Sequence, residues 1–111
     1  MLPKNLRIKI SDFNKNPNKV FKRYSNSFGV YIKDGEEERV KFTISIPKST
    51  DKRSTKRNQT RRFIERIILS LYEKAFNNKE ILIRAKRTVN KENNKELTNE
   101  LETLFKNEFS R

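Results

Sequence analysis

The sequence contains no cysteine and no histidine, and each absence excludes a class of chemistry. Without cysteine the chain has no disulfide, no thiolate nucleophile and no cysteine-ligated zinc or iron–sulfur site. Without histidine it lacks the usual general base and the commonest metal ligand. Acidic residues are dense only over 36–38, after Asp34 and Gly35, which is typical of an exposed turn. We therefore expect no catalytic residue, no metal and no cofactor, and we predict that the chain is not an enzyme.

Long apolar runs are also absent. The longest runs, such as residues 67–69, fall far short of the roughly 18 residues that span a bilayer. Residues 1–10 are basic and alternate polar with apolar side chains, unlike the continuous apolar segment of a secretory signal. We expect a cytoplasmic protein, associated with the nucleoid if it binds DNA.

Positive charge is in excess, because 27 Lys and Arg against 14 Asp and Glu give a net charge of +13 over 111 residues. The length suits one domain with one modest core. Self-repulsion of this size destabilises a compact chain unless an anionic partner relieves it. Abundant lysine and asparagine are typical of AT-rich coding DNA, but that bias does not explain the excess of basic over acidic residues. We therefore predict a single nucleic-acid-binding domain over 1–111.

Period-two alternation of apolar residues predicts four strands. The first covers 6–10, and the fourth covers 81–87. Residues 28–32 and 40–46 are expected to form a β-hairpin in which Val30 lies opposite Val40, Phe28 opposite Phe42 and Tyr31 opposite Arg39. Residues 12–26 are rich in Asn, Lys and Ser and are predicted to be a loop with a short helical turn over 20–24. Its apolar residues are expected to pin it to the core: Phe13, Val20, Phe21 and Tyr24.

Apolar residues spaced by three and four predict two helices. The main helix covers 61–76 and ends at Asn77 and Asn78. The second covers 91–111, where the net charge is −1, so the first ninety residues carry +14. Its stripe either completes the monomer core or forms a homodimer contact: Leu97, Leu101, Leu104, Phe105 and Phe109. The order β-loop-β-β-α-β-α predicts an α+β fold with a four-stranded, mostly antiparallel sheet and two helices on one face.

Residues 48–62 form a run of basic and polar residues in which Asp51 is the only acid. We expect a flexible basic arm that an anion orders. It leads into a helix N-terminus, where cations are unfavourable unless a phosphate compensates them. The candidate nucleic-acid contacts in the arm are Lys52, Arg53, Lys56, Arg57, Asn58, Gln59, Arg61 and Arg62. Candidates on the uncovered sheet face are Arg7, Lys9, Tyr31, Lys33, Arg39 and Lys41, with Thr43, Ser45, Arg84 and Lys86 beside them.

The hairpin followed by a basic helix start, over 28–76, is similar in layout to three-strand-plus-helix DNA-binding modules of the AP2 and integrase arm-binding kind. It also resembles the second half of a double-stranded RNA-binding domain. We predict a non-enzymatic DNA-binding accessory or regulatory protein of a plasmid, phage or low-GC genome, acting at an origin, transfer site or promoter. One alternative is an RNA-binding domain, which we rank below DNA binding because Tyr31 alone offers a ring on the open face. The other is a basic inhibitor or adaptor that docks on an acidic protein surface.

Overall fold

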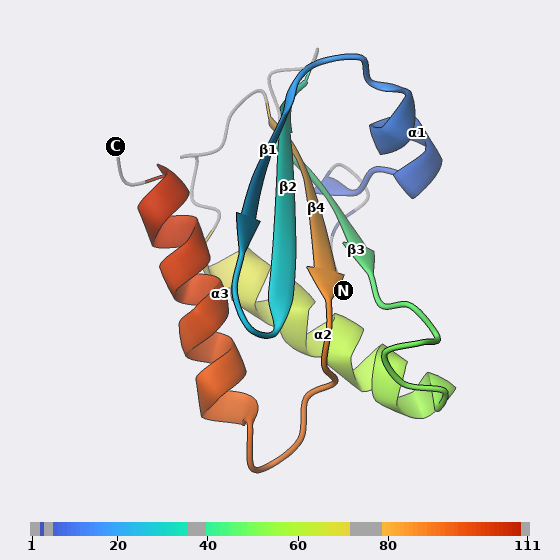
Figure 1. Ribbon diagram of the computed structural model, residues 1–111, viewed down its shortest axis with the longest axis vertical. Coiled ribbons are helices and arrows are strands. Elements are labelled where there is room, and N and C mark those ends of the chain that lie inside the picture. The colour runs from blue at the N-terminus through green and yellow to red at the C-terminus, as the bar shows by residue number, and fades with distance from the viewer. Residues whose placement is uncertain (1–2, 4–5, 36–39, 72–78, 110–111) are drawn as a thin grey trace.

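Four strands and three helices make up the described part of the chain, which comprises residues 3, 6–35, 40–71 and 79–109 of a computed structural model (Figure 1). The α+β class and the four-stranded sheet are confirmed, with three helices where two were expected. The elements in chain order are α1 (Ile10–Lys15), β1 (Val20–Tyr24), β2 (Phe28–Asp34), β3 (Lys41–Ser45), α2 (Ser54–Leu71), β4 (Lys79–Ala85) and α3 (Asn94–Phe109).

The strands form one mixed sheet in the order β1-β2-β4-β3. Antiparallel pairs join β1 to β2 and β2 to β4, whereas β3 runs parallel to β4. The predicted hairpin between 28–32 and 40–46 is therefore wrong, because β4 lies between its two strands and Val30 pairs with Ile83. Alternation identified β2, β3 and β4 but not their partners. The inward residues of β4 are fully buried, which requires a central position: Ile81, Ile83 and Ala85.

The N-terminal region differs from the prediction in two ways. Residues 6–10 are not a strand: Arg7 makes a single bridge to Phe42 and α1 begins at Ile10. The predicted loop instead contains strand β1, which replaces the expected helical turn. Because β1 is an edge strand exposed on both faces, it shows no apolar alternation, and Phe21 and Tyr24 are exposed instead of pinning a loop to the core.

Helices α2 and α3 pack on one face of the sheet and form a single core with it. Leu97, Leu101 and Phe105 are buried in this monomer core, so these side chains offer no surface for the homodimer that was one of the two expectations. Leu104 packs against the same core, and the side chain of Phe109 lies outside the described set. The flexible arm is also corrected, because α2 begins at Ser54 and residues 54–62 are helical. The expected end of this helix at 77–78 lies outside the described residues.

Helix α1 covers part of the opposite, outer face of the sheet. Phe13 is buried there, outside the main core. The Lys33 Nζ donates hydrogen bonds to the carbonyl oxygens of Phe13 at 2.8 Å and Asn16 at 3.0 Å, and lies 4.5 Å from the Phe13 ring centroid. The Asn16 amide donates to Glu80 on β4. Among the described helices, none has the length and apolar character to cross a membrane.

Candidate nucleic-acid interface

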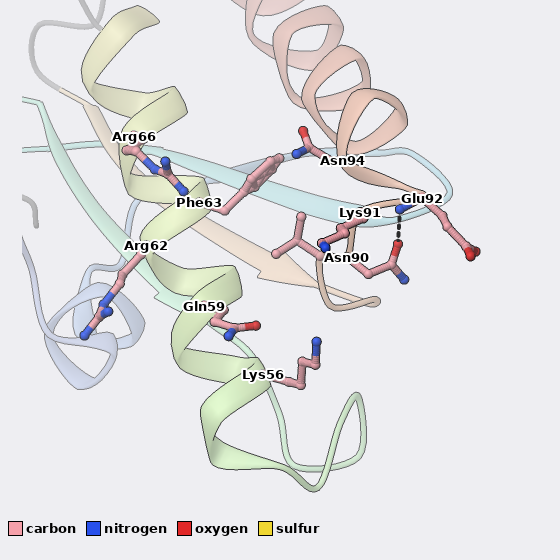
Figure 2. A pocket seen from close by; sticks show the side chains of 10 residues that line it. Lys56, Gln59, Arg62, Phe63, Arg66, Asn90, Lys91, Glu92 and Asn94 are labelled. Carbon is pink, nitrogen blue, oxygen red and sulfur yellow. Dashed lines mark hydrogen bonds between the residues drawn. The ribbon is translucent and has the colours of Figure 1, made fainter.

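A basic groove lies between α2 and the connection from β4 to α3 (Figure 2). Its volume is about 780 Å³. Phe63 and Val89 supply apolar surface, and Lys56 and Gln59 point from α2 toward the turn at Asn90. The groove is lined by Lys56, Gln59, Arg62, Phe63, Arg66, Val89, Asn90, Lys91, Glu92 and Asn94.

The two walls of the groove are joined by the buried hydroxyl of Thr60, and the wall opposite α2 is held by two asparagines. The Thr60 hydroxyl donates to the Lys56 carbonyl at 2.9 Å and accepts the amide of Val89 at 3.0 Å, so α2 is tied directly to the opposite wall. In that wall Asn90 and Asn93 cap each other, each side-chain oxygen accepting the other's amide at 2.8 Å. Because buried polar groups are costly to leave unpaired, these bonds hold the groove in one shape.

The start of α2 is fixed by Asp51. Its carboxylate accepts the Arg53 amide at 2.9 Å, the Arg53 Nε at 3.0 Å and the Arg53 Nη2 at 2.9 Å, and it also accepts the Thr88 hydroxyl at 3.0 Å. The hydrogen bond from the Arg53 side chain, helped by the Arg53 amide and Thr88, holds the pKa of Asp51 well below its usual range. Asp51 is therefore an anion across the physiological pH range.

The predicted arm residues separate into two groups. Lys56, Gln59 and Arg62 line the groove, whereas Lys52, Arg53 and Asn58 are exposed and are not part of its lining. Arg57 and Arg61 instead each donate to backbone carbonyls, Arg57 to Asp51 and Lys52, and Arg61 to Ile44.

Two basic groove residues, Arg66 and Lys91, were absent from the prediction. Arg66 lies within a segment interpreted as core, but its spacing of four from Arg62 and seven from Gln59 places all three on one helix face. That periodicity could have identified Arg66 from the sequence. Nothing in the sequence could have identified Lys91, because only the tertiary structure brings it close to α2.

The outer face of the sheet, which was expected to be open, brings together some of the predicted nucleic-acid contacts. The strand register places Tyr31, Lys41, Thr43, Ser45 and Arg84 on the outer face. Lys33 shares that face, but its ammonium is engaged by α1 and is not presented to a ligand. Arg7 and Arg61 meet in a smaller groove of about 180 Å³ at the edge of β3, together with Glu65. Lys9 is exposed immediately before α1, and Arg39 lies outside the described residues.

An aromatic pair on the outer face was missed because β1 was not predicted. The rings of Tyr24 and Tyr31 meet edge to face with centroids 5.9 Å apart, and the Lys86 Nζ lies 5.1 Å from the Tyr24 centroid. Gly29 makes room for them, since a Cβ there would lie 3.3 Å from both rings. The hydrogen bond with the Tyr24 phenol raises the pKa of Tyr31, and burial raises it further. The Tyr31 side chain therefore stays uncharged.

These surfaces suit a polyanion carrying bases. Lysine and arginine side chains bind phosphate, and paired tyrosines can stack on unpaired bases. Among the described residues no group of His, Cys, Asp or Glu could hold a metal ion.

The model of the Ribonuclease P family matches residues 2–108. The chain belongs to this protein family. The fold is also similar to solved structures of ribonuclease P proteins. One from Staphylococcus aureus is 23% identical with a TM-score of 0.74, covering 93% of this chain and 94% of that one. One from Thermotoga maritima is 15% identical with a TM-score of 0.71, covering 91% and 96%. No curated protein matches.

Membership of this family corrects two expectations. A DNA-binding accessory protein of a plasmid or phage is wrong, because the family points to RNA as the nucleic-acid partner. The RNA-binding alternative, ranked below DNA binding, is the one supported. The prediction that the chain is not an enzyme is contradicted as well, since ribonuclease P is a ribonucleoprotein enzyme, although its protein alone is not catalytic.

Proposed function

We propose that this chain is the protein subunit of a ribonuclease P, binding the RNA of that ribonucleoprotein and its precursor-tRNA substrate without performing the chemistry itself. The observation that carries the proposal is the basic groove on α2, found in a chain whose family match extends over 2–108. The bacterial cytoplasm is then its place of action.

The groove is proposed to bind the RNA phosphate backbone. Lys56, Arg62, Arg66 and Lys91 line it, with Glu92 as the single acid in that lining. Phosphate contacts position a protein on RNA by charge-assisted hydrogen bonds and release counterions, so affinity should fall steeply with salt. Gln59, Asn90 and Asn94 add neutral donors and acceptors that can reach sugar hydroxyls or base edges.

The outer face of the sheet is proposed as a second RNA surface for single-stranded segments. Tyr24 and Tyr31 offer rings for stacking, and Lys22 and Arg84 share their face. Single strands expose base faces that a duplex hides, and an aromatic surface with surrounding cations is the usual way to bind them. Two separate surfaces would let one small protein contact two RNAs at once.

Reconstitution tests the proposal. Ribonuclease P RNA and a precursor tRNA are mixed with and without the protein at low magnesium, and cleavage is followed on a denaturing gel. Both RNAs are polyanions that repel each other, so a cationic protein bound to both should accelerate cleavage most where divalent ions are scarce. Protein alone should cleave nothing. Absence of any acceleration, together with affinity for this RNA no higher than for duplex DNA of equal length, would contradict the proposal.

A further inference from the structure

Asp51 is an acid placed next to a surface that otherwise gathers positive charge. It is the only acidic residue between positions 47 and 62, and its side chain is only 10% exposed. A carboxylate at this point repels the phosphates of an RNA bound to α2. We therefore ask which interactions of Asp51 favour RNA binding by more than this repulsion disfavours it.

The bonds of Asp51 point to such an interaction. Its two oxygens bind the Nε and Nη2 edge of the Arg53 guanidinium, while the Arg53 side chain remains 66% exposed. A guanidinium has a second donor edge, formed by its two terminal nitrogens. Within the described part of the chain, Nη1 of Arg53 has no partner. The carboxylate therefore fixes the plane of the guanidinium and leaves its outer edge for a ligand.

Asp51 also joins three segments that surround the groove. Its carboxylate accepts the Thr88 hydroxyl from the wall opposite α2, and its backbone oxygen accepts Nη1 of Arg57. The adjacent Thr50 hydroxyl donates to the carbonyl of Ala85 at the end of β4. The loop before α2 is thereby attached to the β4–α3 connection, beside the bond from Thr60 that ties the same two walls.

We propose that Asp51 is a positioning residue for RNA binding: it orients Arg53 so that the free edge of the guanidinium meets a phosphate of an RNA bound at the start of α2. The inference rests on the proposed function, because it needs RNA on this surface. An arginine held in advance loses less conformational freedom on binding than a free one, so its hydrogen bonds to phosphate contribute more to affinity.

The sign of a charge change separates positioning from general electrostatics. Asp51→Asn removes a negative charge, so electrostatics alone predicts tighter binding of RNA. Positioning predicts weaker binding, by roughly fivefold or more, because a neutral amide holds the guanidinium less strongly. The asparagine oxygen can still accept the Arg53 amide, which preserves the turn before α2. Asp12→Asn, at an exposed position of α1, is the matched control and should leave the affinity unchanged or slightly higher.

The experiment measures affinity for ribonuclease P RNA, with thermal unfolding as the check on folding. Asp51→Asn should be silent in an Arg53→Ala background, since it acts through Arg53. Arg53→Lys keeps the charge but lacks the fork, and should weaken binding as Asp51→Asn does. Equal or tighter binding by Asp51→Asn, or full affinity in Arg53→Lys, would overturn the inference while the proposed function stands. Failure of the unmodified protein to bind this RNA would remove both.

Discussion

Helices α2 and α3 pack on the same face of the sheet but differ in charge. Between Ser54 and Leu71, α2 has five basic residues and one acidic residue, whereas α3, between Asn94 and Phe109, has two basic and four acidic. Both bury an apolar stripe in the common core. The fold needs only the stripes. The two helices therefore differ in their outward residues, and the proposed function assigns the basic residues of α2, but not the acidic ones of α3, to RNA.

The buried stripes should prove equivalent. We expect Ile68→Ala in α2 and Leu101→Ala in α3 each to lower the free energy of unfolding by about 2–5 kcal/mol, because both side chains are fully buried and leave a cavity. Urea unfolding measures both, with the partly exposed Leu69→Ala as a control that should cost far less. A large loss in α2 with almost none in α3 would show that α3 is not an integral part of the core.

The exposed basic residues of α2 and α3 should differ in their contribution to RNA binding. The double variant Arg62→Gln with Arg66→Gln should weaken binding of ribonuclease P RNA by about 2–3 kcal/mol and lower the salt slope by about two. Both side chains are exposed, so stability should change by less than about 0.5 kcal/mol. Lys95→Gln with Lys106→Gln removes the same charge from α3. An equal loss in the α3 variant would mean that RNA senses only net charge.

Periodicity in the sequence predicted the apolar stripes, the fourth strand and the α+β class, but it could not predict the order of the strands. Alternation assigns a residue to a face and is silent about the neighbouring strand, so β2 was paired with β3 across the place that β4 occupies. The N-terminal half of α2 was missed for a different reason. It has no apolar residue before Phe63 and unfavourable charge at its start, and Thr60 and Asp51 hold it through contacts distant in sequence.

Charge density in the sequence singled out three of the residues that line the groove, namely Lys56, Gln59 and Arg62, and whether they bind RNA stays a prediction. The preference for DNA over RNA depended on finding a single exposed ring. The second ring, Tyr24, lies on an edge strand without alternation, and only the register brings it to Tyr31 over Gly29. Strand pairing between distant residues is a property that local patterns do not contain.

The outer face of the sheet is a second basic surface. Testing it shows whether RNA binding is confined to α2 or extends to the other side of the molecule. Tyr24→Ala or Tyr31→Ala should weaken binding of a single-stranded RNA oligomer by about 1–2 kcal/mol, because each removes a stacking ring. Phenylalanine at either position should restore most of the affinity. The chain has three tyrosines and no tryptophan, so quenching of tyrosine fluorescence reports stacking directly. Phe21→Ala, on the other face of β1, is the control. Affinity that survives both alanine variants would confine RNA to the helical side.

The smallest expected effect concerns a carboxylate of α3 that serves the fold. Glu100 accepts the Ser27 amide at 2.8 Å and the Ser27 hydroxyl at 2.6 Å, which ties α3 to the turn between β1 and β2. Burial would raise the pKa of Glu100, but the hydrogen bonds from Ser27 and Ser25 and the charge of Arg87 outweigh it, and the pKa is lowered.

A lowered pKa means that the folded protein binds the Glu100 proton less readily than the unfolded chain does. This contribution to stability is therefore complete above the unfolded pKa near 4.5 and is lost as the pH falls through the lower folded pKa. Glu100→Gln should cost about 1 kcal/mol at pH 7 and progressively less toward pH 3, as measured by urea unfolding at both pH values.

Glu96→Gln, which removes only an exposed pair with Arg87, should change little. RNA affinity should be unaffected by Glu100→Gln at pH 7, because its effect is confined to the attachment of α3. A loss of RNA affinity with unchanged stability would place α3 in the RNA interface and erase the distinction between the two helices.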